Sequence, residues 1–325
     1  MKEKLRVLSL FSGIGAFEKA LTNIGVNYDL VGFSEIDKYA VKSYCAIHNE
    51  SEDKNLGDVS KVELDDIPNC DLITYGFPCQ SFSVQGKKLG FEDKEKGGLF
   101  FEAMRIAKDK KPKYMIAENV KNLVSHDKGN TLSTVLSTLE DIGYVNYFKV
   151  LNSVDFGIPQ RRERIFIVSI RKDIDEKFEF PQGWKLTKTV ADFIDKENEH
   201  RHLKDSLKPF LDPKYHKEYT SKDGTKKVFD GNSQGYFNSD FCGKRMYSIY
   251  GVCPTLTTKT DAHNFIEIKS GLNGKERMML QGFSEEDYYR AIEVCPLAQI
   301  KKQAGNSITV TVLEEIFKVL FKNNR

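Results

Sequence analysis

The sequence contains no C-x-x-C pair among its six cysteines, which stand at positions 45, 70, 79, 242, 253 and 295. This spacing argues against a zinc site and against the disulfide framework of a secreted protein. An apolar leader after Met1 and an apolar run long enough to cross a membrane are also missing. His200 and His202 form an H-x-H pair without a third ligand nearby, so we expect surface residues and no metal site. These absences predict a protein of the reducing cytoplasm.

A strong excess of one charge is absent too, because 49 lysines and arginines face 47 acidic residues and leave a net charge of +2. The net charge therefore does not indicate a polyanionic partner, and any surface that binds nucleic acid must be local. Tandem repeats and low-complexity tracts are also lacking. At 325 residues the chain can bury a large core, and we expect more than one domain.

The first fifty residues predict a strand, a helix and a second strand with a glycine-bearing turn between them. Residues 5–10 form the apolar strand, and the turn Phe11–Gly15 leads into a helix over about residues 16–23. Glu35 stands at the tip of the second strand, where a carboxylate can accept from ribose hydroxyls. The third glycine of the dinucleotide fingerprint is replaced by Glu18, whose charge would repel a pyrophosphate. The turn therefore suits a nucleoside with a less anionic group than NAD carries.

The stretch Gly76–Ser83 contains the strongest candidate for a reactive side chain. An apolar run at residues 71–75 predicts a buried parallel strand just before it. Pro78 fixes φ immediately before Cys79, which places the cysteine on a rigid turn at the edge where open α/β sheets bind ligands. A polar, glycine-bearing loop follows. Most single cysteines are inert small residues, but this setting favours a reactive thiolate.

Other polar residues also stand near expected strand ends. Asp58 is placed where a third strand should end, and it either accepts from an adenine amino group or caps a loop. Glu118 follows a strand expected at residues 113–117, and without Cys79 it would be interpreted as a solvated loop residue. The arginines within residues 160–164 precede a strand at 165–170. They suit an ordinary salt-bridged face or a clamp on carbonyl or phosphate oxygens.

The second half of the chain loses this alternation of strands and helices. A helix over residues 129–142 and a strand over 144–151 still fit it, but residues 184–277 are polar and irregular. An apolar helix then ends near Phe321. We expect that helix to pack on the first domain, which would make the polar region an insertion.

The residue blocks resemble, in order, those of the cytosine-C5 DNA methyltransferases of bacteria and phages. The matching blocks are Phe11–Gly15, Glu35, Gly57–Asp58, Gly76–Gln80, Gly97–Phe101, Glu118–Val120, Gln160–Arg164, Lys275–Glu276 with Gln281–Phe283, and Gln303–Ser307. Two departures stand out. Lys275 and Met279 replace the two arginines of the family's usual Arg-Glu-x-x-Arg block, and Ile36 replaces the aromatic residue that often follows the ribose-binding glutamate.

The resemblance implies a Rossmann-like α/β fold that binds S-adenosylmethionine, with a smaller, irregular β-rich target-recognition domain inserted before the C-terminal helix. Residues 1–183 and 301–325 would form the catalytic domain, 184–277 the target-recognition domain and 278–300 a hinge. The enzyme would be a sequence-specific DNA (cytosine-5-)-methyltransferase from a restriction–modification system, or a phage or orphan methylase. It would act as a cytoplasmic, nucleoid-associated monomer on double-stranded DNA. A cognate restriction endonuclease would act separately.

The resemblance also assigns roles to individual residues. Cys79 would add to cytosine C6, Glu118 would contact N3 and the exocyclic amine, Arg164 would fix the base, and Arg162 would support the pocket. The implied cofactor-binding residues are Phe11, Gly13, Gly15, Glu35, Ile36, Asp58, Pro78 and Asn306. The implied DNA-binding residues are Gln80, Ser83, Gln85, Arg245, Thr255 and Leu256.

Three alternatives compete with this interpretation. A nicotinamide dehydrogenase shares the first strand–helix–strand unit but gives Cys79 no role. A tRNA cytosine-C5 methyltransferase shares the fold and mechanism, although the Gln80–Ser83 continuation and the large insertion favour DNA. A catalytically silent DNA-binding regulator would not need the complete set of reactive residues. The sequence does not identify the DNA site, the cytosine that is modified, or a host or phage origin.

Overall fold

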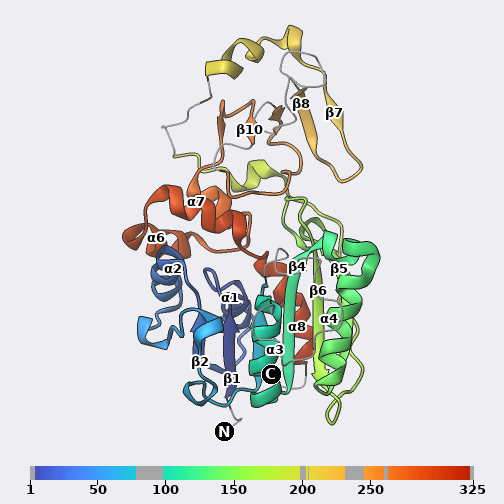
Figure 1. The fold of residues 1–325 in the computed structure, drawn as a ribbon. Helices are drawn as coiled ribbons and strands as arrows, with labels where there is room; N and C mark the ends of the chain where they lie inside the picture. Colours follow the sequence, from blue (N-terminus) through green and yellow to red (C-terminus); the bar gives the residue numbers. More distant parts are fainter. Residues whose placement is uncertain are drawn as a thin grey trace. The chain divides into compact units, whose positions relative to one another are not determined.

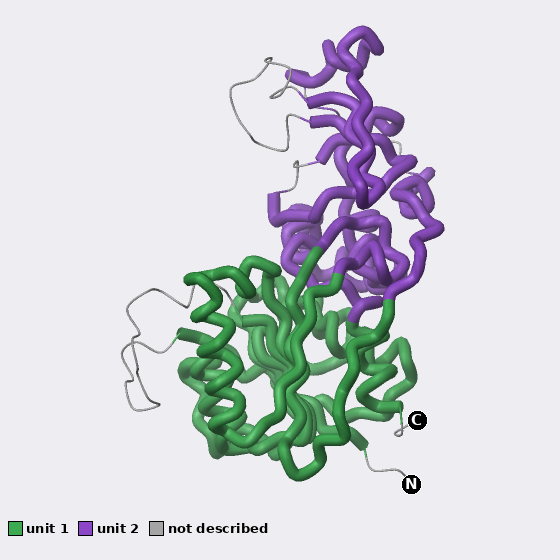
Figure 2. Tube along the Cα trace, turned by 90° about the vertical axis from the view of Figure 1, so that its right-hand side faces the viewer, with its two compact units in different colours: residues 1–151, 163–182, 313–325 green, residues 152–162, 183–312 purple. Residues whose placement is uncertain are grey.

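The computed structural model describes residues 4–77, 98–197, 203, 205–230, 245–259 and 263–322. The chain forms two compact units (Figure 2). Unit 1 contains residues 1–151, 163–182 and 313–325, and unit 2 contains residues 152–162 and 183–312. Residues 152–162 and 278–312 therefore lie in unit 2, whereas the sequence placed most of them with the catalytic domain or in a hinge. No helix among the described residues is long and apolar enough to cross a membrane.

Unit 1 is built on a sheet of six strands in the order β2-β1-β3-β4-β6-β5. The strands are β1 Leu5–Leu10, β2 Tyr28–Ser34, β3 Leu72–Tyr75, β4 Tyr114–Val120, β5 Tyr144–Asn152 and β6 Glu163–Arg171. The first four pair in parallel, and β6 runs antiparallel to β4. This arrangement confirms the predicted Rossmann-like α/β fold.

The helices of unit 1 cover both faces of this sheet (Figure 1). They are α1 Ala16–Asn23, α2 Lys38–His48, α3 Leu99–Lys110, α4 Asn130–Asp141 and most of α8 Val310–Leu320. Short 3₁₀ helices, in both units, are η1 Glu52–Lys54, η2 Val59–Lys61, η3 Leu64–Asp66, η5 Lys121–Val124, η6 His126–Gly129, η7 Ser153–Phe156, η8 Val190–Phe193, η9 Asp205–Leu211 and η10 Pro213–Tyr215.

The inner strands β1 and β3 are mainly apolar because both faces of the sheet are buried there, whereas the edge strand β5 contains exposed residues. On one face the core contains strand residues such as Leu8 and Ile73 packed with side chains of α3 and α4. On the other face Tyr114 of β4 meets Phe321, just after α8, with ring centroids 5.5 Å apart. Phe317 of α8 packs edge-on against Phe17 of α1 at 6.4 Å. The C-terminal helix therefore packs on the first domain, as expected.

Two expectations about strand ends are wrong. The strand expected to stop at residue 117 continues to Val120, because β6 extends the ladder and pairs Glu118 with Phe166 and Val120 with Arg164. No strand ends at Asp58; its side chain caps the 3₁₀ helix η2 by accepting from the Ser60 N–H. An aspartate is a common helix cap because its oxygen satisfies a free backbone donor.

Unit 2 combines a small sheet with short helices. Its strands follow the order β11-β10-β9-β8-β7, and only the β9–β10 pair is parallel. They are β7 Tyr219–Thr220, β8 Lys226–Asp230, β9 Arg245–Tyr247, β10 Asn264–Phe265 and β11 Ser270–Gly271, and the helices are α5 Gly274–Met279, α6 Glu285–Val294 and α7 Leu297–Asn306. This confirms that the region is β-bearing and irregular.

Candidate active site

Four residues that follow paired strand positions form a row along the carboxyl edge of the unit 1 sheet. The register pairs Leu10 with both Ser34 and Tyr75, and Tyr75 with Ala117. The residue after each of these strand positions is therefore Phe11, Glu35, Gly76 and Glu118. Since parallel strands present ligands at their carboxyl ends, this row is the expected place for a cofactor and a reacting group.

Glu35 organises the glycine-bearing turn. Its carboxylate accepts hydrogen bonds from the backbone N–H groups of Gly13 at 2.9 Å, Ile36 at 2.8 Å and Asp37 at 2.8 Å. A carboxylate can accept about four hydrogen bonds, so capacity remains for a ribose hydroxyl. Gly15 must be glycine, because its φ is +77° and an added Cβ would lie 2.1 Å from Nε2 of His48.

Ile36 offers an apolar surface beside Glu35. Its side chain is 78% exposed, which is unusual for isoleucine and leaves a face free for an aromatic ring. Phe11, at the end of β1, adopts φ +55° and packs partly against the core. These features fit an adenosine group, with a carboxylate for its ribose and an apolar surface for its base.

Asn55 ties this turn to the segment that contains Asp58, a role that the sequence analysis missed. Its Oδ1 accepts from the N–H groups of Glu35 and Gly57, and its Nδ2 donates to the Glu35 carbonyl, each at 3.1 Å. Asp58 accepts from the Ser60 hydroxyl at 2.8 Å, and this bond, followed by the one from the Ser60 N–H, lowers the pKa of its carboxyl. No local pattern in the sequence marks Asn55 for this role.

Glu118 and Arg164 form a close ion pair at the same edge. Nε of Arg164 lies 3.0 Å from Oε1 of Glu118, and the two side chains are only 16% and 12% exposed. Their positions on β4 and β6 are diagonal neighbours in the antiparallel ladder, which brings the side chains within reach. The structure therefore brings together two residues that lie 46 positions apart in the sequence.

Asn119 fixes the start of the segment that contains the cysteine. Its Nδ2 donates to the Phe77 carbonyl at 2.8 Å, and its side chain is buried. The chain beyond Phe77 lies outside the described residues until Gly98. The expected site residues within that gap are Pro78, Cys79, Gln80, Ser83 and Gln85.

Arg162 is held inside unit 2 by backbone carbonyls. It is 3% exposed, and its guanidinium donates to the carbonyls of Leu256 at 3.2 Å, Gly305 at 3.2 Å and Ser307 at 2.6 Å. These bonds join three distant segments of the chain. In this position Arg162 stabilises unit 2. Asn306 lies between Gly305 and Ser307, two residues whose carbonyls accept from Arg162, and is exposed at the end of α7.

Gln160 and Gln281 extend this buried network. Gln160 donates to the Leu280 carbonyl at 2.7 Å and accepts from the Leu256 N–H at 3.0 Å. Gln281 donates to the Ala304 carbonyl at 2.6 Å. Blocks that the sequence analysis treated as separate motifs therefore meet in one polar core, where each buried amide has partners.

The block that departs from the family pattern has replacement contacts. Lys275 lies 3.2 Å from Glu285 and 3.8 Å from Asp195, and Arg277 donates to the Thr257 carbonyl. Glu276 accepts from the Asp195 N–H at 2.9 Å. Lys275 therefore forms its ion pairs with Asp195 and Glu285, both in unit 2.

The expected DNA contacts in unit 2 differ in exposure. Arg245 pairs with the buried Asp230 at 3.1 Å, which sequence analysis did not foresee, and is partly exposed. Thr255 is partly exposed and donates to the Arg161 carbonyl at 2.5 Å. Leu256 differs from the expectation, because its side chain is 1% exposed and packs in an apolar cluster around Tyr247. A core side chain in that position has no surface to offer a base.

The comparisons with known proteins agree with this geometry. A family model described as C-5 cytosine-specific DNA methylase matches residues 5–322. The chain belongs to this family. The family uses S-adenosylmethionine as methyl donor.

Two curated relatives span nearly the whole chain. The orphan methyltransferase M.SPRI of Bacillus phage SPR is 35% identical over 435 aligned positions, which cover 98% of this chain and 97% of the relative. The type II methyltransferase M.HhaI of Haemophilus parahaemolyticus is 37% identical over 319 positions, which cover 96% of this chain and 93% of the relative. The cytosine-C5 methylase family predicted from the residue blocks is confirmed.

Solved structures share the fold. A DNMT2 mutant of Spodoptera frugiperda superposes with a TM-score of 0.73 at 17% identity, covering 98% of this chain and 100% of that structure. The Dnmt2 methyltransferase of S. pombe gives 0.70 at 18% identity, covering 99% of both chains. At this level of identity the likeness supports the fold alone.

Proposed function

We propose that this C-5 cytosine methylase is a sequence-specific DNA (cytosine-5-)-methyltransferase that modifies a flipped-out cytosine. The observation that carries the proposal is the Glu118–Arg164 ion pair at the carboxyl edge of the sheet, in the same row as Glu35. A carboxylate held by an arginine suits the polar edge of a cytosine ring. A stacked base cannot reach such a site, so the target must leave the helix.

The chemistry needs a nucleophile because cytosine C5 alone is too weak to accept a methyl group. The thiolate of Cys79 forms a bond to C6, which makes C5 an enamine carbon able to take the methyl group. S-adenosylmethionine supplies that methyl group as a sulfonium. Glu118, in its protonated form, donates to N3 and stabilises the negative charge that develops there. The C5 proton is then lost, its bonding electrons restore the C5–C6 double bond, and the Cys79–C6 bond breaks to return the thiolate.

The cofactor would lie at the glycine-bearing turn. Glu35 would accept from its ribose, Ile36 and Phe11 would pack against the adenine, and Asp58 would accept from the adenine amino group. We propose that Gly13, Gly15, Pro78 and Asn306 also contact the cofactor. The exposed face of Ile36 and the free capacity of the Glu35 carboxylate support this placement.

Unit 2 would read the DNA sequence, with residues 184–277 as the target-recognition part. Thr255 and Arg245 are both partly exposed, which supports this role, and Arg245 would present its remaining donors to DNA. Gln80, Ser83 and Gln85 would contact DNA from the segment after the nucleophile. We propose that the protein acts as a monomer on double-stranded DNA, either with a separate restriction endonuclease or as a phage or orphan methylase.

Methylation by purified variants tests this function. Glu118→Gln and Arg164→Gln should each lower methyl transfer to DNA by about a hundredfold or more, while cofactor binding persists. Glu163→Gln is the matched control, because Glu163 neighbours Arg164 but pairs with Lys121 at the surface. Bisulfite sequencing of DNA from cells that express the protein then locates the cytosine. Full activity in Glu118→Gln would contradict the assignment.

The nucleophile has its own test. A duplex with 5-fluorocytosine at the target should trap the enzyme, since fluorine cannot leave as a proton does. Intact-mass analysis and peptide mapping should place the adduct on Cys79, and Cys79→Ala should neither form it nor methylate DNA. An adduct on another cysteine would refute the assigned nucleophile.

A further inference from the structure

A cavity of about 410 Å³ lies within unit 2, and none of the proposed catalytic or cofactor residues that the structure describes lines it. Its walls come from four stretches of chain, around η7, around η8, at the end of α5 and at the start of α8. Its aromatic lining consists of Phe156, Trp184, Phe193 and Phe283. This volume is within the usual range of small-molecule pockets, and an apolar lining with few polar groups is typical of them.

Trp184 is fixed in the cavity wall by local packing. Its backbone N–H donates to the Asp155 carbonyl at 2.9 Å, and its ring packs edge-on against Phe156 with centroids 5.6 Å apart. Gly157 lies beneath the indole, where an added Cβ would be 3.5 Å from the ring, and its φ of +83° also favours glycine. Yet the side chain remains 48% exposed, so an aromatic surface is held in place without being covered.

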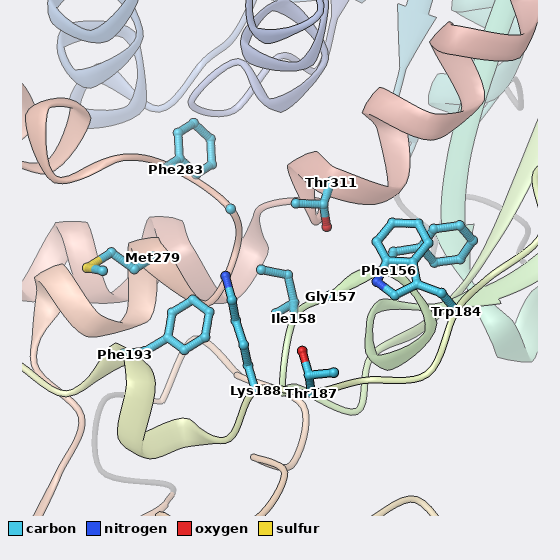
Figure 3. Close-up of a pocket in the computed structure, with 11 residues that line it drawn as sticks. Phe156, Gly157, Ile158, Trp184, Thr187, Lys188, Phe193, Met279, Phe283 and Thr311 are labelled. Carbon is cyan, nitrogen blue, oxygen red and sulfur yellow. The ribbon is translucent and has the colours of Figure 1, made fainter.

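The polar groups of the cavity favour an anion. The Lys188 amine lies 5.7 Å from the centroid of Phe193, and among the described residues no carboxylate pairs with it. The Thr311 hydroxyl has no hydrogen-bond partner in the described part of the chain. Figure 3 shows the Lys188 amine and the hydroxyls of Thr187 and Thr311 directed toward the space between the aromatic walls. Among the residues that the structure describes, no acidic side chain lines the cavity.

We propose that this cavity binds a small aromatic anion. Its ring would pack against Trp184 and the neighbouring aromatic side chains, and its anionic group would accept from Lys188 and a threonine hydroxyl. Aromatic stacking and a charge-assisted hydrogen bond are the two interactions that such a wall supplies. A free aromatic carboxylate and a nucleoside monophosphate share this chemistry.

Trp184 makes the test direct, because it is the sole tryptophan of the chain. Tryptophan fluorescence of the full-length protein is titrated with benzoate and, separately, with 5′-AMP. Benzyl alcohol, which is aromatic but neutral, and cyclohexanecarboxylate, which is anionic but not aromatic, are the matched ligands. We expect a saturable change with both aromatic anions and weaker binding of the two controls. The anion that binds with the higher affinity shows whether the cavity prefers an aromatic carboxylate or a nucleoside monophosphate.

Two variants test whether the charge of Lys188 itself contributes to the binding of the anions. Lys188→Gln should weaken the binding of both anions about tenfold, as expected when one charge-assisted contact is lost. Lys185→Gln removes an exposed lysine that does not line the cavity and should leave the affinity unchanged. The proposal is overturned if neither anion gives a saturable change, if benzyl alcohol binds as tightly as benzoate, or if the two variants behave alike. Because binding is read without DNA or methyl donor, the result is independent of the proposed function.

Discussion

Glu18 should make the folding stability of this methylase depend on pH in an unusual direction. The side chain is 1% exposed, and among the described residues neither carboxyl oxygen has a hydrogen-bond partner. Burial therefore raises the pKa of Glu18 from 4.5 to about 7. Tyr28 and Tyr44 face it, but their own pKa values are raised above 10 and they stay neutral throughout this range.

The direction of the pH dependence follows from which state of the chain, folded or unfolded, keeps the proton on Glu18. Below pH 4.5 Glu18 is protonated in both the folded and the unfolded chain, so its contribution does not vary. Between pH 4.5 and about 7 only the folded chain keeps the proton, and the free energy of unfolding falls by about 1.4 kcal/mol per pH unit. Over this interval the loss is about 3 kcal/mol. Above pH 7 the contribution is again constant.

Glu18→Gln removes this titration while it keeps a similar shape. We expect the variant to gain about 3 kcal/mol on the wild type between pH 4.5 and pH 7, measured by urea unfolding at several pH values. Other ionisable groups cancel when the two curves are subtracted. Glu52→Gln is the control, because an exposed carboxylate is solvated in both states and should give parallel curves. A Glu18→Gln curve parallel to wild type would refute the reasoning.

Four further substitutions address the cofactor site, unit 2 and specificity. Glu35→Ala should weaken S-adenosylmethionine binding by about 1–3 kcal/mol in calorimetry, because a charged hydrogen bond to ribose is lost; unchanged affinity would show a purely structural role. Arg162→Met should lower the free energy of unfolding by at least about 2 kcal/mol in urea, since three buried carbonyls lose their donor. Arg245→Ala and Thr255→Ala should leave cofactor affinity intact and reduce DNA methylation, and at least one should relax the site preference on a randomised duplex library; an unaltered preference in both would move specificity elsewhere.

The sequence predicted the elements of unit 1 well because local signals and tertiary structure agree there. Apolar runs at residues 5–10 and 165–170 became buried strands, and the helix expected at residues 16–23 has the observed bounds. The pairing of Glu118 with Arg164 could also be predicted, because the sequence assigned both residues to one site. The length of β4 was not, because an antiparallel neighbour far along the chain extends it.

Unit 2 was harder to predict because its structure depends on long-range polar contacts. Leu256 resembles a surface landmark in sequence, but its N–H and carbonyl are bound by Gln160 and Arg162, which draw it into the core. Asn55 was missed for the same reason, since its role is to connect backbone groups of β2 and the following loop. No local pattern distinguishes such an asparagine from an ordinary turn residue.

The residue blocks of this family therefore divide into two physical classes. One class, with Glu35 and the Glu118–Arg164 pair, presents polar groups at the carboxyl edge of the unit 1 sheet. The other, with Gln160 and Arg162, binds backbone carbonyls within unit 2. Buried side chains that satisfy several carbonyls tolerate little change, because each lost donor leaves a desolvated acceptor. A motif in this chain can thus have a structural role without touching substrate, and substitution separates the two classes: the first should lose activity before stability, and the second should lose stability first.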